Sequence, residues 1–262
     1  MGIIVSRIDE NPEEWIPYAP QISTAMLKTF VSPLPILKAY ARHGVDFTGE
    51  VNGIYLLDRT HFPDVVEWLL QSGANPDVGT DHPSPLMHYT NRLISYRSNM
   101  YSTPMPMKMM QIMKMLLAAG ADPAYQDSNG NTALHLVLST MDTDPHAPSE
   151  LAEAVCLLMA AGTPVDVENH AGQTVADLFQ TAVQKRPELE EQCSEAHLEE
   201  IRGQLARMKA SFARRKTSLA TVRVAAAHQR NRNNEKQEGG RRHKTRRHKK
   251  AKKAKKTYRR RQ

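Results

Sequence analysis

Short apolar runs that end at a glycine recur along the first two thirds of this chain. Within each run the apolar positions follow a helical spacing, and a glycine comes three or four residues after the run. A glycine just past a helix readily takes the left-handed conformation that ends the helix. The pattern therefore predicts four short helices with glycine stops. The runs and their glycines are Ile36–Tyr40 with Gly44, Val66–Leu70 with Gly73, Met113–Leu117 with Gly120, and Val155–Met159 with Gly162.

A second set of helices is indicated by hydroxyl residues that stand in front of other apolar runs. Ser84, Thr132 and Thr174 each occupy the position of a helix N-cap. A helix of this set comes before the third and the fourth glycine-stopped helix, and one follows the last of them. The repeating unit is therefore a turn, a short helix, a loop, a second short helix and a glycine stop.

Residues 132–137, which read Thr-Ala-Leu-His-Leu-Val, resemble the T-P-L-H-x-A signature of the ankyrin repeat family, with alanine in place of proline. Ser84-Pro85-Leu86-Met87-His88 is a weaker match in which the histidine is displaced by one position, and at Thr174 only the threonine remains. The resemblance covers residues 34–182 and implies an all-α solenoid of about four or five helix-turn-helix repeats. In this family the signature histidine, here His135, links adjacent repeats through hydrogen bonds.

The spacing of the units predicts where this chain differs from a regular repeat. The four glycines lie 29, 47 and 42 residues apart, against a family period of about 33. We expect insertions near residues 91–106 and 140–148, and insertions in such repeats map to loops on one face, often the binding face. Turn loops and insertions therefore supply the candidate partner-binding residues: Asp81, His82, Tyr96, Tyr101, Asp127, Asn129 and Asp142.

Segments of other kinds flank the repeats. Residues 1–33 are expected to form lead-in or cap helices, one of them starting at Asn11-Pro12. Residues 183–228 carry a helical stripe that fits either a coiled-coil seam or a helix that caps the last repeat. Residues 229–240 are polar and end in Gly-Gly, as a flexible linker does. The stripe consists of Leu198, Ile201, Leu205, Met208, Phe212, Leu219 and Val222.

The charge of the chain is concentrated at its C-terminal end. Residues 241–262 contain fourteen Lys or Arg and no acid, whereas residues 1–240 carry 21 basic and 28 acidic residues. Such a run is predicted to be disordered and to bind an import receptor, nucleic acid or anionic lipid. Its style, after Gly-Gly, is similar to tails on proteins of large DNA viruses of protists. The basic residues are Arg241, Arg242, Lys244, Arg246, Arg247, Lys249, Lys250, Lys252, Lys253, Lys255, Lys256, Arg259, Arg260 and Arg261.

The other end of the chain offers an alternative role for this tail. Met1-Gly2-Ile3-Ile4-Val5-Ser6 fits the pattern for N-myristoylation at Gly2. One acyl chain together with a polybasic segment is enough for stable membrane anchoring. A peripheral membrane adaptor is therefore one of the alternatives.

Residues that carry chemistry are scattered. The sequence has no catalytic motif, no phosphate-binding glycine loop and no metal-ligand spacing, so we expect no enzyme activity and no cofactor. Cys156 lies in an apolar run and is expected to be a small core residue, and Cys193 stands near the start of the long helix. With no signal peptide, no disulfide framework and no apolar run of about 18 residues, a reducing intracellular compartment is expected, nuclear or cytoplasmic.

Taken together, these patterns predict a protein-interaction adaptor or scaffold. A rigid repeat domain would present loops and a concave face to a protein partner, and the basic tail would serve nuclear targeting or polyanion binding. A nucleic-acid-associated protein that works through its tail is the first alternative, and the myristoylated membrane adaptor is the second.

Overall fold

A computed structural model describes residues 2–26, 31–51, 53–78, 84–95, 105–144 and 149–214. These residues are mostly helical and fall in one unit, Met1–Arg214. The expected linker and basic tail lie outside the described residues. So do four of the candidate partner-binding residues, Asp81, His82, Tyr96 and Tyr101.

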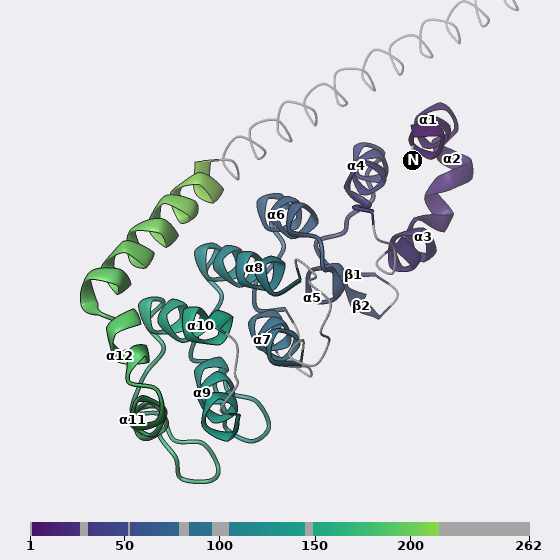
Figure 1. The fold of residues 1–262 in the computed structure, drawn as a ribbon. Helices are drawn as coiled ribbons and strands as arrows, with labels where there is room; N and C mark the ends of the chain where they lie inside the picture. Colours follow the sequence, from purple (N-terminus) through teal and green to yellow (C-terminus); the bar gives the residue numbers. More distant parts are fainter. Residues whose placement is uncertain are drawn as a thin grey trace, which may run out of the picture. The chain divides into compact units, whose positions relative to one another are not determined.

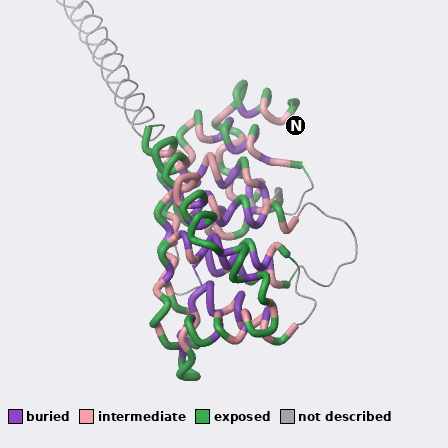
Figure 2. Tube along the Cα trace, turned by 60° about the vertical axis from the view of Figure 1, so that its left-hand side comes forward, coloured by how far each residue is buried: buried purple, intermediate pink, exposed green. Residues whose placement is uncertain are grey.

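The helices in the middle of this unit form two rows (Figure 1). Neighbouring helices within each row contact one another, and the pairs α5–α6, α7–α8 and α9–α10 connect the two rows. The buried segments follow the sides on which the helices face one another (Figure 2), and they form one continuous apolar core. One row contains α6 (Pro63–Ser72), α8 (Met105–Ala119) and α10 (Ser149–Ala160), and the other α5 (Leu56–Arg59), α7 (Pro85–Ser95), α9 (Ala133–Thr143) and α11 (Val175–Lys185).

The predicted glycine stops are confirmed. Gly44, Gly73, Gly120 and Gly162 all have left-handed backbones, with φ between +90° and +102°. They follow α4 (Leu34–Arg42), α6, α8 and α10 respectively. At Gly73 the backbone N–H donates to the carbonyl of Leu70, which satisfies a group that the helix end would otherwise leave without a partner.

The predicted N-caps at Thr132 and Thr174 are also confirmed. The Thr174 hydroxyl accepts a hydrogen bond from the Asp177 backbone N–H, while the Asp177 carboxylate accepts one from the Thr174 N–H, each at 3.1 Å. The hydrogen bond from the Thr174 hydroxyl lowers the pKa of Asp177. At Ser84 the hydroxyl lies 3.4 Å from the Met87 N–H, at the start of α7. The first helix of each of these units therefore begins where its hydroxyl residue predicted.

The N-terminal segment contains more structure than the sequence indicated. It forms α1 (Gly2–Glu10), α2 (Pro12–Trp15), the 3₁₀ helix η1 (Ile16–Tyr18) and α3 (Ala19–Met26), and α1 packs against α4. Asn11 precedes α2, as predicted, but its side chain makes no capping hydrogen bond. An ion pair joins the two packed helices, because the Asp9 carboxylate of α1 lies 2.6 Å from the Arg42 guanidinium.

One small hairpin departs from the expected all-helical architecture. β1 (Glu50–Val51) and β2 (Ile54–Tyr55) are antiparallel, and Glu50 pairs with Tyr55. Gly53, with φ of +71°, lies between the two strands, where a tight turn favours glycine. The hairpin precedes α5, and α5 has only four residues, so the first helix of this unit is short.

The two cysteines are joined, which corrects the expectation that the chain contains no disulfide. Cys156 lies within α10 and is only 1% exposed, as expected of a core residue, but its sulfur is bonded to Cys193. The bridge spans 37 residues, and closing a loop of that length removes about 4 kcal/mol of unfolded-state entropy in the chain-entropy account.

The expected long C-terminal helix is interrupted. α12 (Glu188–Gln192) ends at Cys193, and a separate helix occupies residues 195–214. Leu198 and Ile201 of this second helix are buried in the same core as the repeats. Leu205, Met208 and Phe212 pack against that core. Within residues 195–214 the apolar stripe is thus turned toward the chain's own helices.

His135 connects two neighbouring units. Its ring is fully buried, and Nδ1 accepts a hydrogen bond from the Thr132 backbone N–H at 3.2 Å. Nε2 therefore carries the ring proton and donates to the Gln173 carbonyl of the next unit at 3.2 Å. These bonds agree with the linking role that the resemblance implies for this histidine.

The substitution His135→Ala tests this link. It should lower the free energy of unfolding by about 2–4 kcal/mol, because it leaves a cavity and removes buried hydrogen bonds. Urea denaturation followed by circular dichroism measures the change. The exposed His170 provides the control, since His170→Ala should change stability by less than about 0.5 kcal/mol. Equal effects of the two substitutions would contradict the linking role.

Candidate interaction surface

Three loops lie next to one another in front of successive units, and we call them the turn loops. The first turn loop comprises residues 74–78, the second 121–131 and the third 163–173. The second and third lead directly into α9 and α11. Their sequences are rich in Asp, Asn and Gly, residues whose side chains or backbones suit tight turns.

The second turn loop is stabilised from within by Asp127. Its carboxylate accepts hydrogen bonds from the backbone N–H groups of Asn129 and Asn131, each at 2.8 Å. Its backbone N–H donates to the Asn131 carbonyl at 2.9 Å. The hydrogen bonds of Asp127 therefore fix the shape of the loop, whereas Asn129 is exposed.

The second and third turn loops are joined by polar contacts. The Gln126 side-chain amide donates to the backbone carbonyls of Gly130 and Glu168. The Asn169 amide donates to the Asn131 side-chain oxygen at 2.9 Å. Because the bonds come from both loops, the two loops form one rigid surface.

The two loops approach most closely at Gly130. A Cβ at this position would lie 2.9 Å from a ring carbon of His170 and 3.0 Å from the His170 backbone nitrogen. The φ of Gly130 is +74°, which also disfavours other residues. Gly172 occupies the corresponding place in the third turn loop with the same φ, but a Cβ there would meet nothing within 4 Å.

The first turn loop is tied to the second through Asp77. Its carboxylate accepts a hydrogen bond from the Asp122 backbone N–H at 2.9 Å. Burial raises the pKa of Asp77, the hydrogen bond from Asp122 opposes that rise, and the nearby Asp122 charge adds to it. All three turn loops are thus connected in series.

The structure separates the candidate partner-binding residues that it describes. Asp127 and Asn129 lie in the second turn loop, before α9. Asp142 lies near the other end of α9, about 15 Å further along the helix axis, and its carboxylate pairs with the Lys185 ammonium at 2.5 Å. Gly2 is the first residue of α1 and is exposed.

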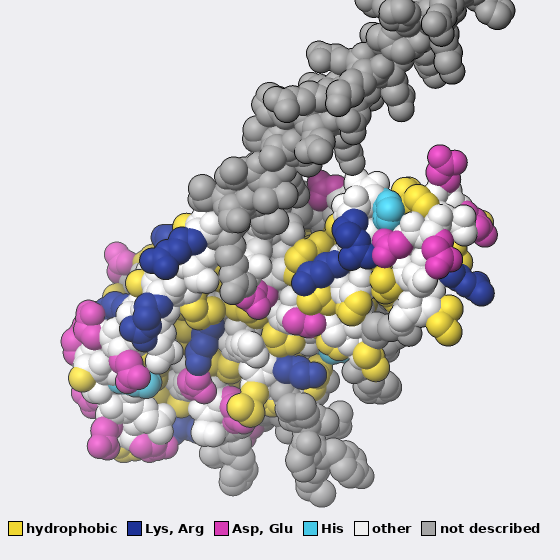
Figure 3. Space-filling model, turned by 90° about the horizontal axis from the view of Figure 1, so that it is seen from above, with side chains coloured by type: hydrophobic (Ala, Val, Ile, Leu, Met, Phe, Trp, Pro, Cys, Tyr) yellow, Lys and Arg dark blue, Asp and Glu magenta, His cyan; other side chains and the backbone are white. Residues whose placement is uncertain are grey.

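One feature of this surface was missed by sequence reasoning, although a local count of charges would have found it. Between Lys114 and Lys185 the chain has nine acidic residues and no Lys or Arg. Asp122, Asp166 and Glu168 are exposed members of this set and lie on the second and third turn loops. The face seen in Figure 3, by contrast, carries both signs of charge.

Among the described residues, no group of three or more His, Cys, Asp or Glu side chains is arranged to hold a metal ion. No helix in the described part is long and apolar enough to cross a membrane. His88 lies 3.7 Å from the Asp58 carboxylate. Burial lowers the pKa of His88, and the Asp58 charge opposes that shift.

Comparison with known proteins identifies one part of the chain. Residues 106–144 match a family model described as ankyrin repeats (many copies). The matched segment contains all of α8 except its first residue, the second turn loop and α9. No curated protein matches the chain.

Gly130→Ala and Gly172→Ala form a matched pair that tests the contact between the turn loops. Gly172→Ala should lower the free energy of unfolding by about 1–2 kcal/mol, through backbone strain alone. Gly130→Ala should lower it by about 1–3 kcal/mol more, because the methyl group also overpacks the contact with the third turn loop. Urea denaturation gives both values. The close approach is refuted if the two variants are equally stable.

Proposed function

We propose that this chain, in which residues 106–144 match the ankyrin-repeat family model, is a non-enzymatic adaptor whose turn loops bind a basic segment of a partner protein. Ankyrin repeats serve generally as protein-interaction modules. The proposal extends the two rows of helices into a repeat solenoid that holds the loops in fixed positions. Recognition, rather than chemistry, would then be the activity of the repeat domain.

The acid-only stretch of the chain carries this proposal. The exposed carboxylates of Asp122, Asp166 and Glu168 lie on loops that are fixed to one another, and from residue 115 to 184 no Lys or Arg neutralises them in sequence. Carboxylates held on a rigid surface attract a cationic partner and set its register. Little conformational entropy is lost on binding, because the loops are already joined.

A charge-reversal pair tests the surface. The probe is a basic peptide selected against the full-length protein from a random display library, with its affinity measured by titration calorimetry. Asp166→Lys with Glu168→Lys should weaken binding by about tenfold or more, since attraction becomes repulsion. Raising the salt concentration should weaken the wild-type complex as well.

Two acidic residues at the other end of the described unit supply the control. Glu13 and Glu14 are exposed on α2, so Glu13→Lys with Glu14→Lys changes the net charge by the same amount far from the turn loops. This variant should bind the peptide like the wild type. An equal loss of affinity in both double variants would show that net charge, not the loop surface, attracts the peptide.

For residues 241–262 the proposed role is nuclear targeting or polyanion binding. The supporting observation is the density of fourteen Lys or Arg with no acid. The full-length protein, tagged within residues 229–240, should accumulate in the nucleus, and a version ending at Gly240 should not. A scrambled tail of identical composition separates an ordered import signal from a simple polycation.

The same imaging experiment addresses the alternatives. Membrane staining that is lost in Gly2→Ala and without the tail would replace this proposal with the anchored adaptor. Nuclear retention that vanishes after nuclease treatment would favour binding to nucleic acid.

A further inference from the structure

The disulfide lies at the junction between the repeats and the C-terminal helix. Cys156 belongs to α10, and Cys193 lies between α12 and the helix of residues 195–214. Both cysteines are buried, at 1% and 7% exposure. The bridge is therefore the last covalent tie to the repeats before the C-terminal helix begins.

Beyond that tie, the helix is held mainly by apolar packing. Leu198 and Ile201 are buried against the common core, and three further apolar residues of the stripe pack against it. The ion pairs described for this helix are internal to it, since Arg202 pairs with Glu195 and Glu199. Such pairs stabilise the helix itself but do not attach it to α10.

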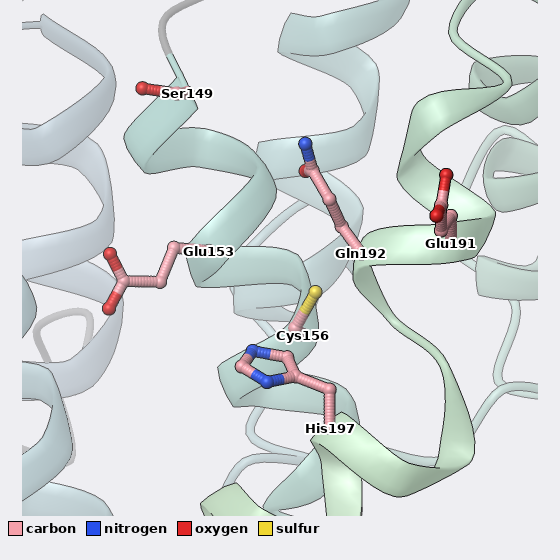
Figure 4. Close-up of a pocket in the computed structure, with 6 residues that line it drawn as sticks. All are labelled: Ser149, Glu153, Cys156, Glu191, Gln192 and His197. Carbon is pink, nitrogen blue, oxygen red and sulfur yellow. The ribbon is translucent and has the colours of Figure 1, made fainter.

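A cavity of about 470 Å³ opens beside the bridge. It is lined by Ser149, Glu153 and Cys156 of α10, by Glu191 and Gln192 of α12, and by His197. Figure 4 shows the Cys156 sulfur and the His197 ring next to each other in its centre, while Glu153 points away. The Cys156 side of the bridge therefore borders a pocket, although Cys156 itself is only 1% exposed.

We propose that the Cys156–Cys193 bridge is a redox-controlled clamp that fastens the helix of residues 195–214 to the repeats. During a local opening, a thiolate of an external dithiol attacks one sulfur of the bridge, which forms a mixed disulfide and releases the other sulfur as a thiolate that takes up a proton. The second thiol of the reductant then resolves the mixed disulfide. Two cysteine thiols and the oxidised dithiol are the products, and two electrons have entered the protein.

Reduction leaves the C-terminal helix attached through its apolar stripe alone. The helix then opens more often, because the tie just before its first residue no longer limits its separation from α10. The repeats keep their own core in both states, since the helices that form the two rows contact one another directly. Reduction of the clamp therefore changes how often the C-terminal helix opens, without unfolding the repeat domain.

Hydrogen exchange on the full-length protein tests this clamp. Intact mass and thiol titration first establish that air-oxidised protein has the bridge and that dithiothreitol removes it. Reduction should then accelerate amide exchange within residues 195–214 by about tenfold or more, while exchange in α8 and α9 stays unchanged.

The variants Cys193→Ser and Cys156→Ala should exchange rapidly in residues 195–214 with and without dithiothreitol. Wild-type protein gives the same comparison without any substitution, so a variant that folds poorly does not decide the test. Two free thiols in the oxidised preparation would overturn the proposal. Unchanged exchange in residues 195–214, or acceleration in all helices alike, would overturn it as well.

Discussion

Burial of apolar surface between neighbouring units is the constraint on which the rest of this structure depends. A pair of short helices cannot cover its own apolar face, and each unit here packs against the next. The burial is most extensive in helices such as α10, in which eight of the twelve residues are buried, including Cys156. Each fully buried large apolar side chain contributes about 1.5–3 kcal/mol. Within the described residues no further unit follows α11, and α12 and the helix of residues 195–214 contribute Leu189, Leu198 and Ile201 to the same core.

Local signals predicted the elements of the fold well because local chemistry causes them. Gly73 ends its helix through a left-handed backbone, and Thr132 and Thr174 begin theirs with capping boxes. These effects act within about one helical turn, so a single sequence contains them. The burial of His135 followed from its place in the repeat rather than from its chemistry, since an isolated histidine does not reveal its partner.

Features that depend on distant parts of the chain could not be predicted in this way. Cys156 and Cys193 are 37 residues apart, and only the packing of α12 on α10 brings their sulfurs together. The break at Cys193 between α12 and the following helix could not be predicted, because the helical spacing of apolar residues continues across it. In the candidate surface, Asp142 was grouped with Asp127 by its place in an insertion, but α9 separates the two. The acidity of residues 115–184, by contrast, could have been predicted by counting charged residues within the repeats alone.

The turn loops divide their polar residues between two tasks. Asp127, Gln126 and Asn169 use their side chains to hold the loops together, so a substitution there alters the shape of the whole surface. Asp166 and Glu168 are exposed, and their carboxylates can change without loss of the network, because the bond between loops at residue 168 uses the backbone carbonyl. In the proposed adaptor, Asp166 and Glu168 would contact the partner, whereas Asp127, Gln126 and Asn169 hold the loops in shape. Stability and the proposed recognition are therefore assigned to different side chains of the same loops.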